Sequence, residues 1–172
     1  GAVPVELGIN NLINNSRGIN GLVFDIDGLP GTVTASDFIF QMSPTGDFNE
    51  GSNPPGGWVS APAPSSVSVT PGSPDRVLIQ WPNNAIPNRW LRITVLANTN
   101  TGLQAPQVYY IGHLLGETTG PSGTLFGVSF ADVALIRSNI GNTVNSSSIH
   151  DIDKSGGVSF ADIAAMRGNI GT

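Results

Sequence analysis

Oxygen-bearing side chains recur at alternate positions near the end of this 172-residue chain, in the stretch DIDKSGGVSFAD. Asp151, Asp153 and Ser155 stand at the first, third and fifth of its twelve positions, and Asp162 stands at the twelfth. Calcium takes roughly six to eight oxygen ligands, so alternate side chains must turn inward while the backbone wraps around the ion. We therefore predict a calcium (Ca2+) site built from these four side chains and the carbonyl oxygen of Gly157.

The spacing is that of an EF-hand-type calcium loop, in which a glycine at position six allows a sharp turn. Gly156 occupies this position, and a helical pattern follows the loop. The generic motif ends in glutamate, whereas Asp162 is shorter and must bring its helix closer to the ion. The alternative interpretation is an Asx-rich surface turn that caps a helix without binding metal.

The stretch is duplicated. Gly127–Gly141 (GVSFADVALIRSNIG) and Gly157–Gly171 (GVSFADIAAMRGNIG) share 11 of 15 residues at an offset of 30 positions. A duplicated loop–helix unit of this kind, with no helix before the loop, resembles a type I dockerin module. The resemblance covers residues 116–172 and implies two calcium loops, a pair of helices and docking onto a cohesin-like partner.

The first copy of the loop has lost the side-chain oxygens of the motif. Counting back from Asp132, positions one, three and five carry Pro121, Gly123 and Leu125. A calcium site here would need an enlarged loop, and the alternative is a loop held by packing, with Asp132 as a helix cap. The side chains that an enlarged loop offers are Glu117, Thr119, Thr124 and Asp132.

Apolar residues at helical spacing follow each loop. Such spacing gives each helix one apolar stripe, and we expect the two stripes to pack on each other. Phe130 and Phe160 are expected to join this small core. The stripe residues are Val133, Ile136 and Ile140 in the first helix, and Ile163, Met166 and Ile170 in the second.

The first two thirds of the chain alternate short apolar runs with turn residues. This pattern predicts a mainly β fold, an antiparallel β-sandwich of the immunoglobulin or jelly-roll kind over residues 1–115, before the helical module at 116–172. The first strand is expected at Val3, Val5, Leu7 and Ile9, which alternate with other residues, and Asn10–Gly18 reads as turns. The other expected strands are Ile19–Ile26, Asp37–Met42, Trp58–Ala61, the run around Val67 and Val69, Val77–Trp81, Trp90–Leu96 and Gln107–Ile111.

This predicted sandwich has a second resemblance. The runs DRVLIQWPNNAIPNRWLRITVLANTNTGL and QVYYIGHLLGETTG are similar to sandwich modules that precede dockerin-like repeats in secreted planctomycete proteins. The resemblance runs from about Ser16 to Thr119. It implies a large secreted or surface assembly. These modules have no assigned chemistry that could be carried over to this chain.

Composition excludes several classes of function. A net charge of −5 leaves no basic patch for nucleic acid, and the absence of cysteine excludes disulfides and thiolate metal sites. No apolar run approaches the roughly 18 residues of a membrane helix, so membrane insertion is not expected. No signal peptide remains, and a loop with serine and aspartate ligands suits millimolar calcium, so we expect a mature extracellular protein at the cell surface or secreted.

No catalytic pattern is present in the sequence. His113 and His150 are the only histidines, and neither lies near a nucleophile elbow. No spacing brings two carboxylates to the separation that glycoside hydrolysis requires. We therefore expect a protein that is not an enzyme, and that acts as a calcium-binding structural or assembly protein.

Three modes of interaction remain open for such a protein. In the first, the apolar strand at the start of the chain inserts into the sandwich of the next subunit and builds a filament, although it also suits an edge strand of its own sandwich. In the second, the dockerin-like part docks onto a cohesin-like scaffold, where Phe130-Ala131 and Phe160-Ala161 replace small hydroxyl residues of the family. In the third, a carbohydrate stacks on Trp58, Trp81 and Trp90.

Overall fold

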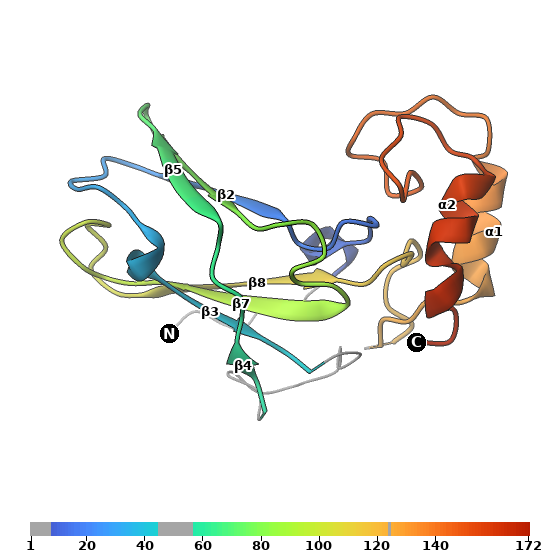
Figure 1. The fold of residues 1–172 in the computed structure, drawn as a ribbon, viewed down its shortest axis with the longest axis horizontal. Coiled ribbons are helices and arrows are strands. Elements are labelled where there is room, and N and C mark those ends of the chain that lie inside the picture. Colours follow the sequence, from blue (N-terminus) through green and yellow to red (C-terminus); the bar gives the residue numbers. More distant parts are fainter. Residues whose placement is uncertain (1–7, 45–56, 124) are drawn as a thin grey trace.

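The computed structural model describes residues 8–44, 57–123 and 125–172, and shows a mainly β chain with two sheets and two short helices (Figure 1). Apart from the first, the expected strands are found with small shifts at their ends. The strands are β1 (Leu12–Ile13), β2 (Gly21–Ile26), β3 (Phe38–Met42), β4 (Val59–Ser60), β5 (Ser66–Thr70), β6 (Asp75–Gln80), β7 (Arg89–Val95) and β8 (Gln107–His113).

The predicted first strand falls mostly on residues 1–7, which lie outside the described residues. Its last residue, Ile9, is not in a strand: it begins the 3-10 helix η1 (Ile9–Asn11). β1 follows η1 within the segment that we expected to form turns, and it pairs with the end of β8. This strand has only two residues, too few to show an alternating pattern in the sequence.

The strands form a five-stranded sheet in the order β1-β8-β7-β3-β4 and a three-stranded sheet in the order β2-β6-β5. All neighbours are antiparallel, as expected, except that β1 runs parallel to β8. The two sheets share one apolar core because alternate residues of the central strands point between them. Fully buried residues of this core include Val77 and Ile79 of β6, and Leu91 and Ile93 of β7.

The two helices, α1 (Phe130–Ser138) and α2 (Phe160–Met166), stand side by side at one end of the sheets (Figure 1). The predicted stripes do meet: Ile136 and Met166 are fully buried in one cluster, and the other stripe residues pack around them. Trp90 of β7 and Leu114 belong to the same cluster, so the helices share their core with the end of the larger sheet. Within the described residues, no helix has the length and apolarity needed to cross a bilayer.

The expectation that Phe130 and Phe160 are core residues is wrong, since their exposed fractions are 78% and 71%. Each is the first residue of its helix. At about 100° per residue, this position lies roughly a quarter turn from the centre of the stripe that begins three residues later. The loop–helix repeat therefore presents the same aromatic side chain to the solvent twice.

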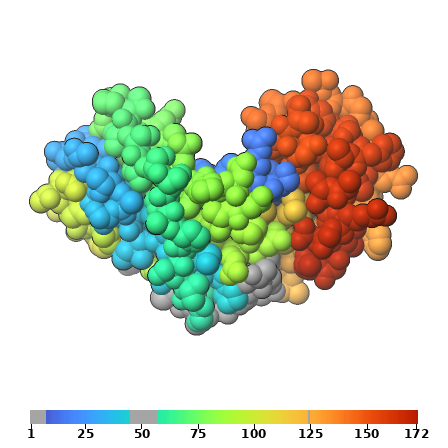
Figure 2. Space-filling model, in the orientation of Figure 1, coloured from blue at the N-terminus to red at the C-terminus, as the bar shows by residue number. Residues whose placement is uncertain are grey.

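Several hydrogen bonds join the helical unit to the sheets, although Figure 2 shows a notch between the two parts. The buried Asn14 amide donates to the carbonyl oxygens of Glu117 and Ile149, at 2.8 and 2.7 Å. The backbone N–H of Ser16 donates to the carbonyl oxygen of Ile152 at 2.9 Å. The segment after β1 is thus attached directly to the second of the two loops.

His113 is a buried structural residue of this junction. Its Nδ1 accepts the backbone N–H of Asn88 at 2.9 Å, so Nε2 carries the proton and donates to the carbonyl oxygen of Asn15 at 2.6 Å. Burial lowers the pKa of His113 from its ordinary value, and the hydrogen bond to Asn15 opposes this only in part. Protonation of Nδ1 would remove the acceptor for Asn88.

We expect the protein to lose stability below about pH 6.5, because the folded state then binds fewer protons at His113 than the unfolded state does. The free energy of unfolding should fall by at most about 1.4 kcal/mol per pH unit until the folded pKa is reached. Urea unfolding of the calcium-saturated protein at pH 7 and pH 5.5 measures this change. His113→Gln should flatten the dependence of the free energy of unfolding on pH. His150→Gln, at a half-buried position, should flatten this dependence less. An unchanged slope in His113→Gln would contradict the assignment.

Candidate metal centre

Three carboxylates of the second loop converge at the start of α2. One oxygen from each of Asp151, Asp153 and Asp162 lies within 4.8 Å of the others. Asp151 and Asp162 are fully buried, and Asp153 is half-buried. Buried carboxylates this close together repel one another unless a cation or hydrogen-bond donors neutralise them.

The backbone of the loop orients Asp151. Gly156 adopts φ +94°, a conformation that residues with a side chain rarely adopt, and the chain turns sharply there. As a result, the N–H groups of Ser155 and Gly156 donate to the two oxygens of Asp151 at 3.0 and 2.9 Å. The glycine at position six thus serves the role for which the motif requires it.

The helix cap orients Asp162. Ser159 caps α2, and its N–H donates to Oδ2 of Asp162 at 2.8 Å in a capping box. Oδ1 of Asp162 accepts the N–H groups of Ile152 and Asp153 at 2.7 and 3.1 Å. The twelfth position of the loop is therefore held against the first three, which closes the ring of predicted ligands.

The donor set suits a hard cation. Ser155 Oγ lies 3.3 Å from the carbonyl oxygen of Gly157, so the two further predicted ligands are neighbours. Oδ2 of Asp153 has no hydrogen-bond partner among the residues that the structure describes, and its lone pairs are open to an ion. An all-oxygen site with three carboxylates fits calcium better than zinc, which favours nitrogen and sulfur ligands.

The structure also brings together three of the four side chains expected in the enlarged first loop: Glu117, Thr119 and Asp132. Thr119 Oγ1 lies 3.1 Å from an oxygen of each carboxylate. Both carboxylates are fully buried. Thr124, the fourth candidate, lies outside the described residues.

Hydrogen bonds show how the two loops correspond. Oδ1 of Asp132 accepts the N–H groups of Thr118 and Thr119 at 2.7 and 3.1 Å, the same two distances that Asp162 makes to Ile152 and Asp153. Glu117 therefore takes the place of Asp151, and the first loop is four residues longer than the second. Counting twelve positions back from Asp132 selects the wrong residues because it assumes equal lengths.

The carboxylate oxygens of the first loop already accept hydrogen bonds from its own backbone. Oε1 of Glu117 accepts the N–H of Gly120 at 2.9 Å, and Oε2 accepts the N–H of Gly127 at 3.0 Å. Oδ2 of Asp132 accepts the N–H of Ser129 at 2.8 Å. The oxygens of Asp151 and Asp162 accept backbone N–H groups in the same way, so the loops differ in that only the second has a third carboxylate, Asp153, with an open oxygen.

The two carboxylates of the first loop differ in acidity. Burial raises the pKa of Glu117, and the negative charge of Asp132 adds to this effect while backbone hydrogen bonds oppose it. Burial alone would also raise the pKa of Asp132, but hydrogen bonds from Thr118 and Ser129 outweigh it and hold the pKa below its ordinary value. The first loop therefore stabilises one of its two charges well and the other poorly.

The tryptophans do not form a common platform. Trp81 and Trp90 are buried in the two cores, with exposed fractions of 4% and 5%. Trp58 is half-buried and meets Tyr110 edge-on, with ring centroids 6.0 Å apart. A sugar that stacked on all three rings would need surfaces that the protein core already covers.

No family model matches this chain, and no curated protein or solved structure matches it. Its function must therefore be inferred from the arrangement of its residues. The second loop offers oxygen ligands to a hard cation, and its backbone is hydrogen-bonded to the segment after β1, which leads into the smaller sheet. These two features are the starting point for the function.

Proposed function

We propose that this chain is a non-catalytic, extracellular, calcium-stabilised structural protein that assembles through contacts between protein subunits. The convergence of Asp151, Asp153 and Asp162 is the observation that carries the proposal. A calcium ion bound there would neutralise the repulsion between the carboxylates. Because the unfolded chain has no such site, binding would stabilise the folded protein.

The position of the site suggests what calcium would stabilise. Ile152, the second residue of the loop, accepts the N–H of Ser16, and Asn14 is bonded to both halves of the helical unit. A rigid loop would therefore fix the helices relative to the sheets. Such a role suits a subunit that must keep a fixed shape within an assembly.

Two finer parts of the proposal concern the architecture. The shared core of the two sheets supports a β-sandwich. The matching caps of the helices support a dockerin-like pair, since Ser129 and Ser159 each accept an N–H two residues ahead at 3.1 Å. The resemblance to dockerin-bearing secreted proteins points to the same extracellular setting.

The proposal is tested by measuring mass and metal binding on the full chain. Calorimetry should show calcium binding, with magnesium much weaker. Mass photometry or native mass spectrometry should show multiples of 17.8 kDa in calcium that decline when a chelator is added. Absence of calcium binding would contradict the whole proposal. A protein that binds calcium but remains monomeric would contradict only the proposed assembly.

A second candidate function is docking onto a cohesin-like partner. The exposure of Phe130 and Phe160 at equivalent positions of α1 and α2 favours it, because two such rings supply contact area at low cost in side-chain entropy. We expect Phe130→Ala/Phe160→Ala to weaken partner binding without changing the melting temperature, and Leu125→Ala, at another exposed apolar position, to serve as the control. If the double variant instead loses self-association, this helix face is the contact between subunits.

A further inference from the structure

A hollow of about 330 Å³ lies between the two sheets, at the end that faces away from the helical unit. It is bounded by the turn after β2, the connection between β7 and β8, and the first residues of β8 (Figure 1). Its volume is at the small end of the range for ligand sites in proteins, roughly 300–1,000 Å³. None of the residues that line it belongs to the second loop, so a ligand bound here would share no residue with the metal centre.

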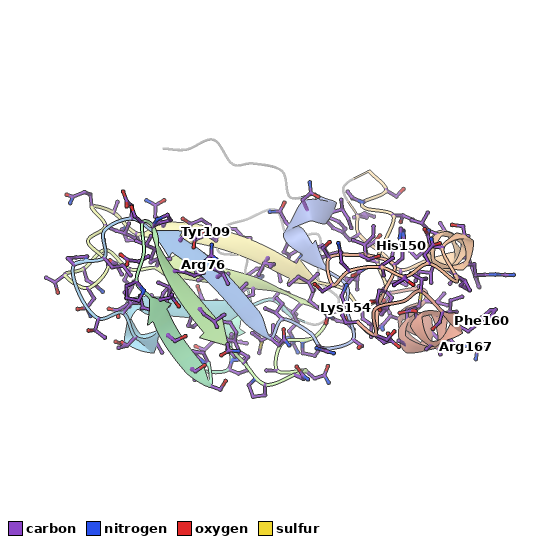
Figure 3. All side chains as sticks on the ribbon, turned by 90° about the horizontal axis from the view of Figure 1, so that it is seen from above. Arg76, Tyr109, His150, Lys154, Phe160 and Arg167 are labelled. Carbon is purple, nitrogen blue, oxygen red and sulfur yellow. The ribbon has the colours of Figure 1, made fainter. Side chains whose placement is uncertain are left out.

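The inner part of the hollow is apolar. It is lined by Ile26, Val95 and Leu103, and Val95 belongs to the buried core of the two sheets. Two aromatic rings form one side of it: Phe24 of β2 and Tyr109 of β8 have centroids 5.3 Å apart and planes inclined at 58°. Figure 3 shows Tyr109 on β8, beside β2. Its side chain remains 47% exposed, so part of the ring is available to a ligand.

Contacts behind the lining hold the hollow in shape. The ring of Phe24 packs on that of Phe38, which is buried, with centroids 6.1 Å apart. In the connection between β7 and β8, Gly102 adopts φ +67° and lies so close to Pro30 that a β-carbon there would be 3.0 Å from the proline ring. The walls therefore rest on packed residues, and a ligand would pay little to order them.

The exposed side of the hollow carries negative charge. Asp25 and Asp27 line it, and its described lining contains no lysine, arginine or histidine. Asp25 is already paired, because Nε and Nη2 of Arg76 donate to its two oxygens at 2.9 and 3.1 Å. The carboxylate of Asp27 accepts no hydrogen bond from the residues that the structure describes. The N–H of Leu29 donates to Asp75 at 2.9 Å, which restrains the turn that carries Asp27.

We propose that this hollow binds a small organic cation, an alkylammonium group with an apolar body, through the ring of Tyr109 and the carboxylate of Asp27. The face of an aromatic ring carries negative charge density, which attracts a cation placed over it. The unpaired carboxylate attracts the same charge. The apolar inner part of the hollow accepts the methyl or methylene groups, whose transfer out of water is favourable.

The same lining disfavours other classes of ligand. An anion would meet two carboxylates and the faces of two rings, and the nearby guanidinium of Arg76 is already bound to Asp25. An uncharged molecule would make the apolar contacts but would gain little from the charge of Asp27. The inference goes beyond the structural role proposed above and does not depend on it, because the hollow and the metal centre have no residue in common.

Choline and its uncharged isostere 3,3-dimethylbutan-1-ol test the role of charge, because the two molecules have nearly the same shape. In NMR titrations of the full chain, choline should shift the backbone amide resonances of Gly28, Gly102 and Leu103, which line the hollow. The isostere should bind roughly tenfold more weakly, since it loses both the cation–π contact and the attraction to Asp27. Added salt should weaken the binding of choline, because the carboxylate is exposed.

Two pairs of variants separate the two contributions. Asp27→Asn should weaken choline binding by about three- to fivefold, and Asp27→Glu should restore most of it. Tyr109→Leu should weaken choline binding by a similar factor, whereas Tyr109→Phe, which keeps the ring, should not. The Asp27 pair keeps the test valid if Tyr109→Leu does not fold, because the side chain of Asp27 is exposed and contributes no hydrogen bond to the described structure.

Three results would overturn the proposal. The first is the absence of shifts at these amides in millimolar choline. The second is equal binding of choline and its isostere, or unchanged binding in Asp27→Asn, either of which would indicate an uncharged ligand. The third is that methyl β-glucopyranoside, titrated in the same way, shifts the same amides at lower concentrations than choline does, which would assign the hollow to a sugar.

Discussion

Calcium should raise the melting temperature of this protein by roughly 5–10 °C at about a hundredfold excess over its dissociation constant. The second loop has three carboxylates within 4.8 Å, an open oxygen on Asp153 and a glycine in the conformation that the turn requires. Only the folded chain presents these oxygens together, so the binding free energy adds to the free energy of unfolding. Asp162→Ala or Asp151→Ala should remove most of the increase.

Differential scanning calorimetry with calcium and with chelator measures this effect. Asp25→Ala is the matched control, because Asp25 is in an exposed ion pair with Arg76 on β2 and β6, at 2.9 Å. It should keep the full response to calcium. A control variant that lost the response as completely as Asp162→Ala would show that calcium acts through net charge and not through the loop.

The variants Asp132→Ala and Asp162→Ala should have different free energies of unfolding in the presence of calcium. In chelator, their free energies of unfolding should be similar. Each carboxylate accepts two N–H groups on one oxygen and the N–H of its capping serine on the other. In chelator, loss of these charged, buried acceptors should cost each variant about 2–4 kcal/mol of unfolding free energy. In calcium, Asp162→Ala should lose the metal contribution as well, whereas Asp132→Ala should keep most of it.

Urea unfolding of both variants in calcium and in chelator gives the four values needed. The physical reason for the difference is the number of carboxylates. Glu117 and Asp132 of the first loop accept backbone hydrogen bonds on both oxygens, as Asp151 and Asp162 do, but only the second loop adds a third carboxylate, Asp153, with an open oxygen. Calorimetric titration provides the matching affinities. Equal losses of calcium affinity in the two variants would mean that the first loop binds calcium as strongly as the second.

Features that depend on the spacing of nearby residues could be predicted from the sequence. The twelve-residue spacing from Asp151 to Asp162 places three carboxylates together, because the loop turns within a few residues at Gly156. Serine three positions before aspartate formed both capping boxes, and the apolar stripes located the buried faces of α1 and α2. Alternating apolar residues likewise predicted the strands, because the two faces of a strand differ at each step.

Features that depend on contacts between residues far apart in the chain could not be predicted in this way. The first loop has four extra residues, and only its hydrogen bonds to α1 show that Glu117 replaces Asp151. The two-residue strand β1 forms only because β8 lies beside it. The strand order of the two sheets is likewise encoded by no local pattern, because pairing partners are chosen by the packing of the whole chain.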